Sequence, residues 1–473
     1  INLAEGLHEA GVTLLGTSAS SIALAEDRDQ FENLLRELGL PKPPGRAVRS
    51  LSEAQQVAEE VGYPVLVRPS FVLGGRAMEI VAGPEHLEAF YDEAENANPG
   101  QPVLVDKYFV GTEAEVDVIS DGIDTLVPGI MEHVERAGIH SGDSMAVYPP
   151  VTLSPETQGR IVEAACRLAH ALGVRGLMNI QFVVVDEEPY VLEVNPRASR
   201  TVPYISKVTG IPMVALATRC ALGDRLADLG YTSGTWWPRA DVPKPDAWRR
   251  EPLAPRTPGR IIPLGEELPS VTRPLYAVKS PVFSFQKLGR VEPALGPEMK
   301  STGEVLGIDE SYEAALYKAL VASGVNFRER GQVILTVADV DKPLALEVAK
   351  HLLAAGYEIG ATRGTHEFLA AGGVASERLG KVQDEGDTLL SRIYEGRVSL
   401  MVNTPVPGQQ STADALRIRR ACIETGVACL TSIDTAVALA HAIEYFQNPE
   451  ATTCRSLTEY VGAWTETAPH PVS

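Results

Sequence analysis

The sequence predicts a protein of the α/β and α+β classes, in which a mixed unit of hairpins and helices is followed by a doubly wound parallel sheet. In the first part of the chain, strand-like segments are joined by short polar turns, as between residues 178–185 and 190–194. From about residue 330 onward, apolar strands alternate with amphipathic helices. Such alternation is typical of a parallel sheet covered by helices on both faces.

Composition limits the classes of function. The chain has 473 residues, 44% of them hydrophobic, which is enough for two or three domains. A formal net charge of −20 disfavours nucleic acid or an anionic membrane as the main partner, although a local basic pocket for a nucleotide stays open. There is no membrane-length apolar run and no signal peptide. Five scattered cysteines without a C-x-x-C motif fit a reducing cytoplasm, with Cys166 and Cys220 as buried thiols.

The first residues have the pattern of the end of a larger domain. Residues 1–10 have a helical pattern and residues 12–16 read as a short buried strand. A lone helix and strand cannot bury their own faces. We therefore expect residues 1–20 to be the remnant of a domain whose bulk lies upstream.

Arginines and glycines then indicate an anionic ligand. Arg28, in the first turn of a helix that runs to about residue 38, opposes the helix dipole unless an anion binds it; an ordinary surface arginine is the alternative. Between strands at 64–69 and 78–81, Gly74 and Gly75 offer backbone N–H groups that suit phosphates, with Arg68 and Arg76 on either side. The loop has no P-loop signature, and a plain hairpin turn is the alternative.

Two further segments have features of a nucleotide site. The strand at 103–109 has backbone groups that can bind a flat base, and the strand at 115–119 brings carboxylates that can accept from a ribose; an ordinary hairpin is the alternative. Residues 137–144 read as a loop over a site, in which His140 either faces a ligand or is exposed to solvent. The spacing of His133 and His140 does not indicate a metal site.

The hairpin at 178–195 carries the strongest chemical signal. If its turn is the three residues 186–188, Gln181 lies opposite Glu193, and Asn195 shares their face. Hard oxygen ligands with a single carboxylate suit Mg²⁺. Arg197 and Arg200 follow at once, as a transferring phosphoryl group requires. The alternative is a polar hairpin edge with a solvated glutamate and two surface arginines.

The next segments are less informative. An amphipathic packing helix is expected around residues 161–172, and residues 204–227 are expected to be helical and apolar. From residue 231 to 269 the chain contains Trp236-Trp237-Pro238 and seven later prolines. We interpret this Pro-rich stretch as a surface loop or insertion, after which strand patterning resumes at 282–285.

The second unit begins near residue 330. Strands are expected at 333–337, 358–362, 398–404 and 427–430, with helices at 344–355, from 364, at 413–426 and at 434–446. Ligands of parallel sheets bind at the carboxyl ends of the strands. Seven polar residues at these positions indicate a small phosphate-bearing ligand; they are Thr336, Lys342, Thr362, Thr365, Lys381, Asn403 and Thr404. The alternative is that they are ordinary polar strand ends and surface lysines.

The chain resembles the carboxyl-terminal half of the large subunit of carbamoyl phosphate synthetase through the segments SFVLGGRAMEIV, GIMEHVERAGIHSGDS, RGLMNIQF, LEVNPRASRTVPYISK and GPEMKSTGEVLG. The resemblance covers nearly the whole chain and departs at residues 235–263, which are longer than expected. It implies an ATP-grasp fold followed by a doubly wound parallel-sheet, methylglyoxal-synthase-like domain. The implied boundaries are 1–20 for a remnant of a pre-ATP-grasp domain, 21–295 for the ATP-grasp domain, 296–328 for a connecting segment and 329–473 for an allosteric nucleotide-binding domain.

The resemblance implies a cytoplasmic enzyme that phosphorylates carbamate with ATP, giving carbamoyl phosphate and ADP for pyrimidine and arginine biosynthesis. It assigns two Mg²⁺ or Mn²⁺ ions to Gln181, Glu193 and Asn195, with K⁺ as a further candidate ion. Arg197, Arg200 and Asn195 would act at the transferred phosphoryl group and the carbamate. The implied nucleotide contacts are Arg28, Arg68, Lys107, Phe109, Glu115, Gly138, Ile139, His140, Ser141, Gln181 and Glu193.

The same resemblance implies control by UMP as inhibitor or IMP as activator, bound by the seven polar residues of the second unit. Ornithine is a less secure effector. Glu135 and Asp143 match its acidic contacts, but Cys429 and Leu430 replace a Tyr-Asp pair, which leaves Thr431. We therefore expect a weak or absent response to ornithine.

The implied partners are the glutamine amidotransferase small subunit and the amino-terminal synthetase half, in a homo- or hetero-oligomer. Two rival functions stay open. One is another ATP-grasp ligase such as biotin carboxylase, which also uses a Glu-x-Asn-x-Arg hairpin; the HSGDS loop and the second unit argue against it. The other is a nucleotide-sensing fragment that is inactive without its missing half.

Overall fold

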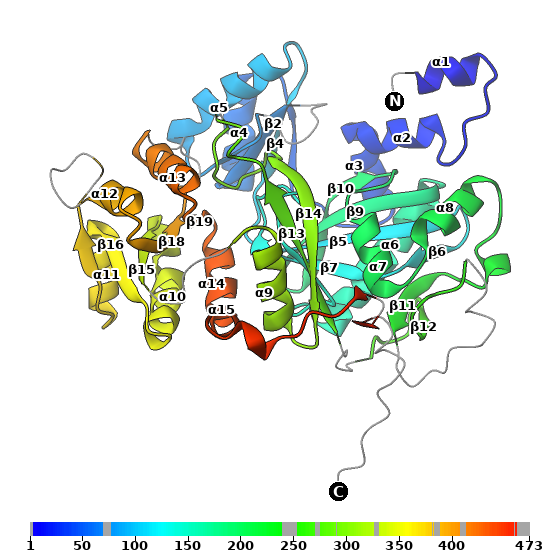
Figure 1. Cartoon of the computed structure of the whole chain (residues 1–473). Coiled ribbons are helices and arrows are strands. Elements are labelled where there is room, and N and C mark those ends of the chain that lie inside the picture. The colour runs from blue at the N-terminus through cyan, green and yellow to red at the C-terminus, as the bar shows by residue number, and fades with distance from the viewer. Residues whose placement is uncertain are drawn as a thin grey trace, which may run out of the picture.

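The computed structural model describes residues 3–69, 77–238, 253–269, 275–289, 291–325, 331–380, 382, 388–406, 413–457 and 459–460. These residues form a four-stranded, a ten-stranded and a five-stranded β-sheet (Figure 1). The first two sheets come from the first 309 residues and the third from the rest of the chain. The α/β and α+β prediction is therefore confirmed.

The four-stranded sheet is antiparallel throughout, in the order β1-β4-β2-β3. Val65 and Val67 alternate toward a core that is covered by two helices, which is the period-two pattern of a sheet packed on one face. The elements are β1 (Gly45–Val48), α4 (Leu51–Val61), β2 (Val65–Pro69), β3 (Glu79–Val81), α5 (Pro84–Ala97) and β4 (Val103–Lys107). The loop between β2 and β3, with Gly74, Gly75 and Arg76, lies outside the described residues.

The ten-stranded sheet follows the path β12-β11-β6-β5-β7-β8-β13-β14, and β9 joins β5 to β10. Each strand pair is antiparallel except β11 with β6. The strands are β5 (Thr112–Asp121), β6 (Thr125–Val127), β7 (Ile130–Arg136), β8 (Ala146–Tyr148), β9 (Arg175–Val185), β10 (Glu188–Asn195), β11 (Gly234–Pro238), β12 (Gly259–Pro263), β13 (Tyr276–Phe283) and β14 (Ser301–Asp309).

Helices cover both faces of this sheet. Helix α6 (Pro155–Ala171) begins at the N-cap Ser154 and packs Ile161 and Leu168 on one face. Residues 204–227, which were expected to be helical, lie in three separate helices, namely α7 (Val202–Thr209), α8 (Met213–Ala221) and the short 3₁₀-helix η1 (Ala227–Leu229). The break falls where Gly210 adopts a left-handed conformation, with φ 73°, and Pro212 follows. Helices α7 and α8 cover the other face.

The Pro-rich stretch is not simply a surface loop. Its ends form β11 and β12, which pair with each other at the edge of the ten-stranded sheet. Trp236 and Trp237 are buried there, and Pro238 and Pro263 each end a strand, where a missing N–H disturbs the ladder least. Residues 239–252 lie outside the described residues.

The segment 296–328, expected to be a connection, contains regular structure. Strand β14 pairs with β13 along its length, and helix α9 (Tyr312–Ala322) packs on both strands. This part of the chain therefore completes the ten-stranded sheet. On its other side α9 contacts α14 (Ile433–His441) and α15 (Ile443–Gln447), as Figure 1 shows.

The five-stranded sheet is parallel, in the order β17-β16-β15-β18-β19, as the doubly wound prediction requires. Its strands are β15 (Gln332–Thr336), β16 (Glu358–Thr362), β17 (Glu377–Leu379), β18 (Val398–Asn403) and β19 (Ala428–Leu430). With α14 and α15, its further helices are η3 (Asp339–Asp341), α10 (Lys342–Ala354), α11 (Arg363–Ala371), α12 (Leu389–Tyr394), α13 (Ala413–Thr425) and η4 (Pro449–Ala451).

The start of the chain differs from the expectation. Helices α1 (Ala4–Glu9), α2 (Ala19–Glu26) and α3 (Arg28–Glu37) are present, but residues 12–16 form no strand. Val12 and Leu15 are exposed. A strand needs a partner to satisfy its backbone groups, and no described strand pairs with residues 12–16.

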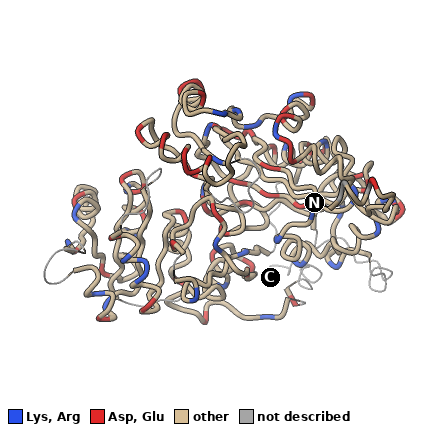
Figure 2. Tube along the Cα trace, turned by 90° about the horizontal axis from the view of Figure 1, so that it is seen from above, with Lys and Arg blue, Asp and Glu red and all other residues tan. Residues whose placement is uncertain are grey.

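The cysteines and charges agree with the composition. Cys166 and Cys220 are buried free thiols, as predicted. Acidic and basic positions are interspersed along the chain rather than separated into two halves (Figure 2). Among the described residues, no helix is both long and apolar enough to cross a membrane.

Candidate active site

Gln181 pairs directly with Glu193 across the β9–β10 hairpin. The predicted three-residue turn is wrong: the turn is Asp186-Glu187, with both residues at positive φ (49° and 64°), as in a two-residue hairpin. This turn alone would shift the register by one residue. A β-bulge at Leu192 adds that residue back to β10, so the predicted pairing is restored.

The face of this hairpin carries three side chains whose oxygen atoms can bind a metal ion. The Asn195 side chain donates to Glu193 Oε1 at 2.6 Å, and Gln181 Nε2 donates to Ser141 Oγ at 3.1 Å. Among the described residues, the Gln181 carbonyl oxygen accepts no hydrogen bond, and the Glu193 residue is exposed. Two amides and one carboxylate fit the donor chemistry of Mg²⁺.

Two arginines follow the hairpin. Arg197 Nη2 donates to Asn195 Oδ1 at 3.0 Å, while Arg200 Nη1 contacts Ser301 Oγ at 3.0 Å and Met299 Sδ at 3.2 Å. Both are exposed, and neither forms an ion pair with a carboxylate of the described residues. Their charges are therefore free to meet an anion.

The loop after β7 is fixed by groups that are distant in the sequence. The His140 N–H donates to Gly296 O at 2.9 Å, and Lys279 Nζ donates to Ser141 O at 2.9 Å. Lys279 is a fully buried lysine on β13, 138 residues from Ser141, so the sequence analysis missed it. These contacts hold the Gly138–Ser141 segment beside Gln181.

His140 is partly buried, which favours the first of its two predicted roles. Its Nδ1 accepts the Gly142 N–H at 3.0 Å. Burial lowers the pKa of His140 below its usual value and outweighs the nearby carboxylates, Asp143 first among them. The ring is therefore neutral at pH 7, with Nε2–H as the donor that remains.

Arg28 and Arg68 meet at Asp106, which the sequence analysis did not single out. Arg28 donates to both carboxylate oxygens of Asp106, one contact being 3.0 Å, and its Nε donates to Glu32 at 2.9 Å. Arg68 Nη2 lies 3.5 Å from Asp106. The Arg68 Nε is buried without a hydrogen-bond partner among the described residues. An anionic ligand could accept the hydrogen bond that this buried arginine N–H lacks.

Lys107 and Phe109 lie at the end of β4. The Lys107 ammonium donates to the carbonyls of Gly62 at 2.9 Å and Tyr63 at 3.0 Å, at the C-terminus of α4. The Phe109 ring packs on Tyr190 of β10, with 4.8 Å between centroids. The small and the large sheet therefore meet at Phe109.

Glu115 lies inside a buried network. Its carboxylate accepts from Asn179 at 2.7 Å and Thr201 at 3.1 Å, and lies 3.4 Å from His133 Nε2. The other ring nitrogen of His133 lies 3.1 Å from Glu113. Burial alone would lower the pKa of His133, but the two glutamates raise it to about 9. His133 is therefore a buried cation at pH 7.

Glu113 is the glutamate that reaches the loop. Its Oε1 accepts the Gly138 N–H at 3.2 Å, whereas Glu115 contacts none of the loop residues Gly138, Ile139, His140 and Ser141. The resemblance implied Glu115 as the nucleotide contact, and the pattern placed the start of the strand at that residue. The strand in fact begins at Thr112, with an irregularity at Glu113.

The polar ends of the parallel sheet converge as expected. Thr362 Oγ1 donates to Thr336 Oγ1 at 3.2 Å, and Thr404 Oγ1 accepts the Ala338 N–H at 2.9 Å. The buried Asn403 Oδ1 has no hydrogen-bond partner among the described residues. The remaining predicted residues of this edge are Thr365, which accepts from the backbone at 3.5 Å, and Lys342, which pairs with Asp339 at 2.7 Å. Lys381 lies outside the described residues.

The residues linked to ornithine lie where the two domains meet. Glu135 accepts from Thr435 Oγ1 at 2.7 Å, and Thr431 Oγ1 accepts the Leu295 N–H at 3.0 Å. Asp143 accepts two backbone N–H groups at the start of β14. Both carboxylates are therefore already satisfied by protein groups.

Two protein families match successive parts of this chain. The family model described as the carbamoyl-phosphate synthase L chain ATP binding domain matches residues 27–229, and the MGS-like domain matches residues 344–431. Among solved structures, the biotin carboxylase domain of the Hydrogenobacter thermophilus 2-oxoglutarate carboxylase, in complex with MgADP, ADP and bicarbonate, is 21% identical, over 68% of this chain and 70% of its own, with a TM-score of 0.49. Biotin carboxylase from Campylobacter jejuni is 18% identical, over 68% and 71%, with a TM-score of 0.49.

The two family matches follow each other along the chain in the order that the structure shows. The first spans α3 through η1, which includes the Gln181–Glu193 hairpin, and the second lies within the parallel-sheet domain. An ATP-grasp domain of the carbamoyl-phosphate synthase type followed by an MGS-like domain is the architecture of the carboxyl-terminal half of the carbamoyl phosphate synthase large subunit.

Proposed function

We propose that this chain transfers the γ-phosphoryl group of ATP to carbamate, giving carbamoyl phosphate and ADP, in the cytoplasm as a part of glutamine-dependent carbamoyl phosphate synthesis. The observation that supports it most is the pairing of Gln181 with Glu193 on one hairpin face, beside Ser141 of the loop. Arg197 and Arg200 lie next to this face, free of carboxylate partners among the described residues. The MGS-like domain favours carbamoyl phosphate synthesis over other ATP-grasp reactions.

The reaction needs positioning and charge neutralisation more than covalent catalysis, because a carbamate oxygen is already a nucleophile. Gln181, Glu193 and Asn195 would hold Mg²⁺, which when bound neutralises charge on the β- and γ-phosphates. Arg197 and Arg200 stabilise the negative charge on the phosphoryl group in the transition state of its transfer. Mn²⁺ in place of Mg²⁺, and K⁺ in addition, belong to the same proposal.

The small sheet and the loop would hold the nucleotide. Arg28 and Arg68 would bind phosphate oxygens, with the unpartnered Arg68 Nε as one donor. Phe109 lies where the two sheets meet and would contact the adenine. Because Glu115 is committed to its buried network, Glu113 is the better placed carboxylate for the ribose. The segment from Gly138 to Ser141 would exclude water from the transferring phosphoryl group.

The reverse reaction tests this proposal directly. The full chain, incubated with ADP, Mg²⁺ and carbamoyl phosphate, should form ATP. Glu193→Gln should lower that rate by about 100-fold or more, since it removes the only carboxylate among the three proposed ligands. Glu156→Gln, the same change on an exposed side chain of α6, should leave the rate unchanged. No ATP from the wild-type chain, or equal rates in both variants, would contradict the proposal.

Two rivals are separated by simple measurements. A biotin-carboxylase-like ligase would carboxylate free biotin with bicarbonate and ATP, which the proposed enzyme would not do. A nucleotide-sensing fragment would bind both MgATP and UMP in calorimetric titrations without catalysing either reaction. ATP synthesis that depends on carbamoyl phosphate, without carboxylation of biotin, excludes both.

The edge of the parallel sheet is proposed to bind UMP or IMP. Thr362 and Thr365 lie at the beginning of α11, where backbone N–H groups favour a phosphate, and the Asn403 oxygen is an unsatisfied acceptor among the described residues. Lys342 begins α10 at the same edge, and Lys381 belongs to the same proposal. Thr365→Ala and Lys342→Ala should each weaken UMP binding by about tenfold, and exposed Lys350→Ala should not.

The wider assembly is also proposed. A glutamine amidotransferase subunit would supply ammonia, and an amino-terminal synthetase half would supply carbamate. Both would associate with the ATP-grasp domain in a homo- or hetero-oligomer. Co-purification of this chain with the two partners expressed together, followed by glutamine-dependent synthesis, would test this assembly.

A further inference from the structure

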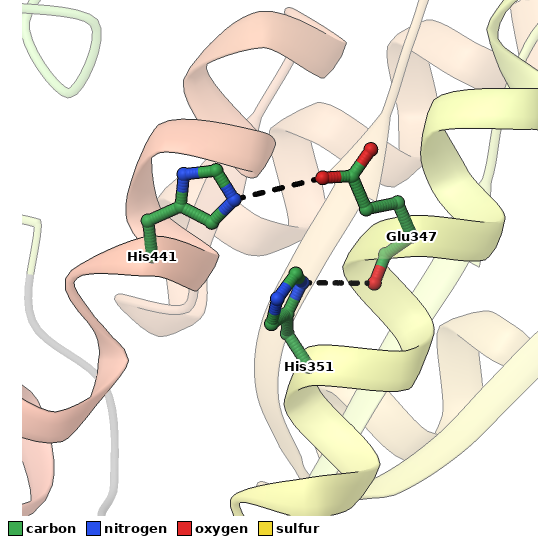
Figure 3. A group of neighbouring side chains, drawn as sticks. All are labelled: Glu347, His351 and His441. Carbon is green, nitrogen blue, oxygen red and sulfur yellow. Dashed lines mark hydrogen bonds and ion pairs between the residues drawn. The ribbon is translucent and has the colours of Figure 1, made fainter.

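Three potential metal ligands meet on the surface of the parallel-sheet domain. Glu347 and His351 are one turn apart on α10, and His441 lies in the last turn of α14. One ligand atom from each lies within 4.8 Å of the others. Figure 3 shows the three side chains converging from the two helices. None of the three belongs to the proposed catalytic or effector sites.

The hydrogen bond of His351 fixes which nitrogen is free. Its Nδ1 lies 3.2 Å from the backbone carbonyl of Glu347, so Nδ1 carries the proton and donates it. The lone pair then lies on Nε2. A backbone carbonyl on the second ring nitrogen is the usual way in which a metal-binding histidine is oriented.

His441 points at the carboxylate. Its Nε2 lies 3.6 Å from Glu347 Oε1, and its ring lies edge-on to that of His351, with 5.1 Å between centroids. Among the described residues, the Glu347 carboxylate has no other ion-pair partner. No lysine or arginine of the described chain therefore neutralises the position that a cation would take.

The backbone that carries the ligands is well fixed. Val348 and Leu352 on α10, and Leu439 and Ala442 beside His441, are buried in one hydrophobic cluster. The three ligand side chains are exposed, so an ion in solution can reach them. The site therefore combines a rigid base with accessible ligands.

We propose that Glu347, His351 and His441 form a surface site for one divalent ion of the zinc class. Two imidazoles and one carboxylate, with water as the fourth ligand, are a known tetrahedral set for Zn²⁺. Zinc–ligand distances of about 2.0–2.1 Å place ligand atoms roughly 3.4 Å apart. The ligand atoms now lie within 4.8 Å of one another, and we expect rotation of these exposed side chains to bring them to that spacing when the ion binds.

Such an ion would join α10 to α14. Helix α10 begins at Lys342, in the proposed effector pocket, and α14 begins beside Asp434, which contacts the ATP-grasp domain. The ion would therefore stabilise the folded state by an amount that grows with its free concentration. This inference is independent of the proposed catalytic function.

The test uses the full chain, stripped with a chelator, in a Cys454→Ser background that removes the exposed thiol. Calorimetric titration with Zn²⁺ should give one ion per chain. Glu347→Gln, His351→Ala and His441→Ala should each weaken binding at least about tenfold. His170→Ala, which removes an exposed histidine of α6, should leave binding unchanged.

Two further measurements keep the proposal falsifiable if a variant folds poorly. Co²⁺ should give the visible d–d bands of a four-coordinate site without a sulfur charge-transfer band. Zn²⁺ should raise the Tm of the parent chain and not that of His441→Ala. Zn²⁺ affinity that is unchanged in His441→Ala, or a sulfur-to-cobalt band, would overturn the assignment.

Discussion

Arg136 and Asp434 form a two-pronged ion pair across the boundary between the two domains. Arg136 Nε and Nη2 each lie 2.9 Å from a different oxygen of Asp434, although the residues are 298 positions apart. Arg136 Nη2 also lies 3.7 Å from Asp341, the residue before Lys342. Because Arg136 ends β7 and the active-site loop follows it, one guanidinium joins that loop to the edge of the parallel sheet.

Arg136→Gln should lower the free energy of unfolding by about 1–2 kcal/mol, because it leaves two partly buried carboxylates without their cation. Urea unfolding measures the change. Arg219→Gln is the control, since its pair with Asp224 is more exposed, and it should cost less than about 0.5 kcal/mol. Equal losses in the two variants would contradict the assignment, as would a double-mutant cycle of Arg136 with Asp434 that shows no coupling.

His133 makes stability depend on pH in the alkaline range. Its pKa is raised from 6.5 to about 9 in the folded state, so its contribution is fully present below pH 6.5 and is lost as the pH rises through 9. Up to roughly 3 kcal/mol of the free energy of unfolding should disappear over that interval. Urea unfolding of wild type and His133→Gln at several pH values measures it, because the difference between them should shrink as the pH rises. A difference in the free energy of unfolding that stays constant with pH would contradict the prediction.

Gly138 is expected to be intolerant of any side chain. Its φ is +103°, and a Cβ there would come within 2.7 Å of Ile80 Cδ1 and 2.9 Å of the Tyr108 hydroxyl. Gly138→Ala should therefore displace the loop and weaken MgATP binding by about tenfold or more, at a stability cost of about 1–3 kcal/mol. Gly100→Ala is the control, since its φ is +80° and nothing lies within 4 Å of its Cβ. MgATP titration should show an effect in the first variant alone.

Trp236 tests whether the Pro-rich region belongs to the core. It is only 3% exposed on β11. Trp236→Ala should cost about 3–5 kcal/mol of the free energy of unfolding. Tyr394→Ala removes an aromatic ring that is 60% exposed and should stay within about 0.5 kcal/mol. A loss below about 1 kcal/mol for Trp236→Ala would mean that β11 is a peripheral element.

Short-range patterns predicted much of the chain correctly. Strand–helix alternation predicted the parallel sheet, and the period of two placed Gln181 and Glu193 on one face. That placement was correct through two compensating errors, since neither the two-residue turn nor the bulge at Leu192 was foreseen. A bulge depends on cross-strand packing and leaves no mark in the periodicity of one strand.

Long-range contacts were beyond the sequence. Asp106 lies 78 residues from Arg28 and Lys279 lies 138 from Ser141, so no local spacing could indicate either pair. The Pro-rich stretch misled for the opposite reason: its local composition is that of a loop, but burial of two tryptophans at a sheet edge overrides composition. The strand expected at residues 12–16 failed because local hydrophobicity cannot supply a pairing partner.

A single hydrophobic cluster runs from Val147 and Val278 of the ten-stranded sheet, through Leu316 of α9, to Val333 and Leu439 of the parallel-sheet domain. The ATP-grasp domain and the parallel-sheet domain therefore share one hydrophobic core, and removing either domain would expose that core to water. Cutting the chain near residue 329 should give two aggregation-prone fragments rather than two independently folded domains. A calorimetric scan of the intact chain should accordingly trace a single melting peak.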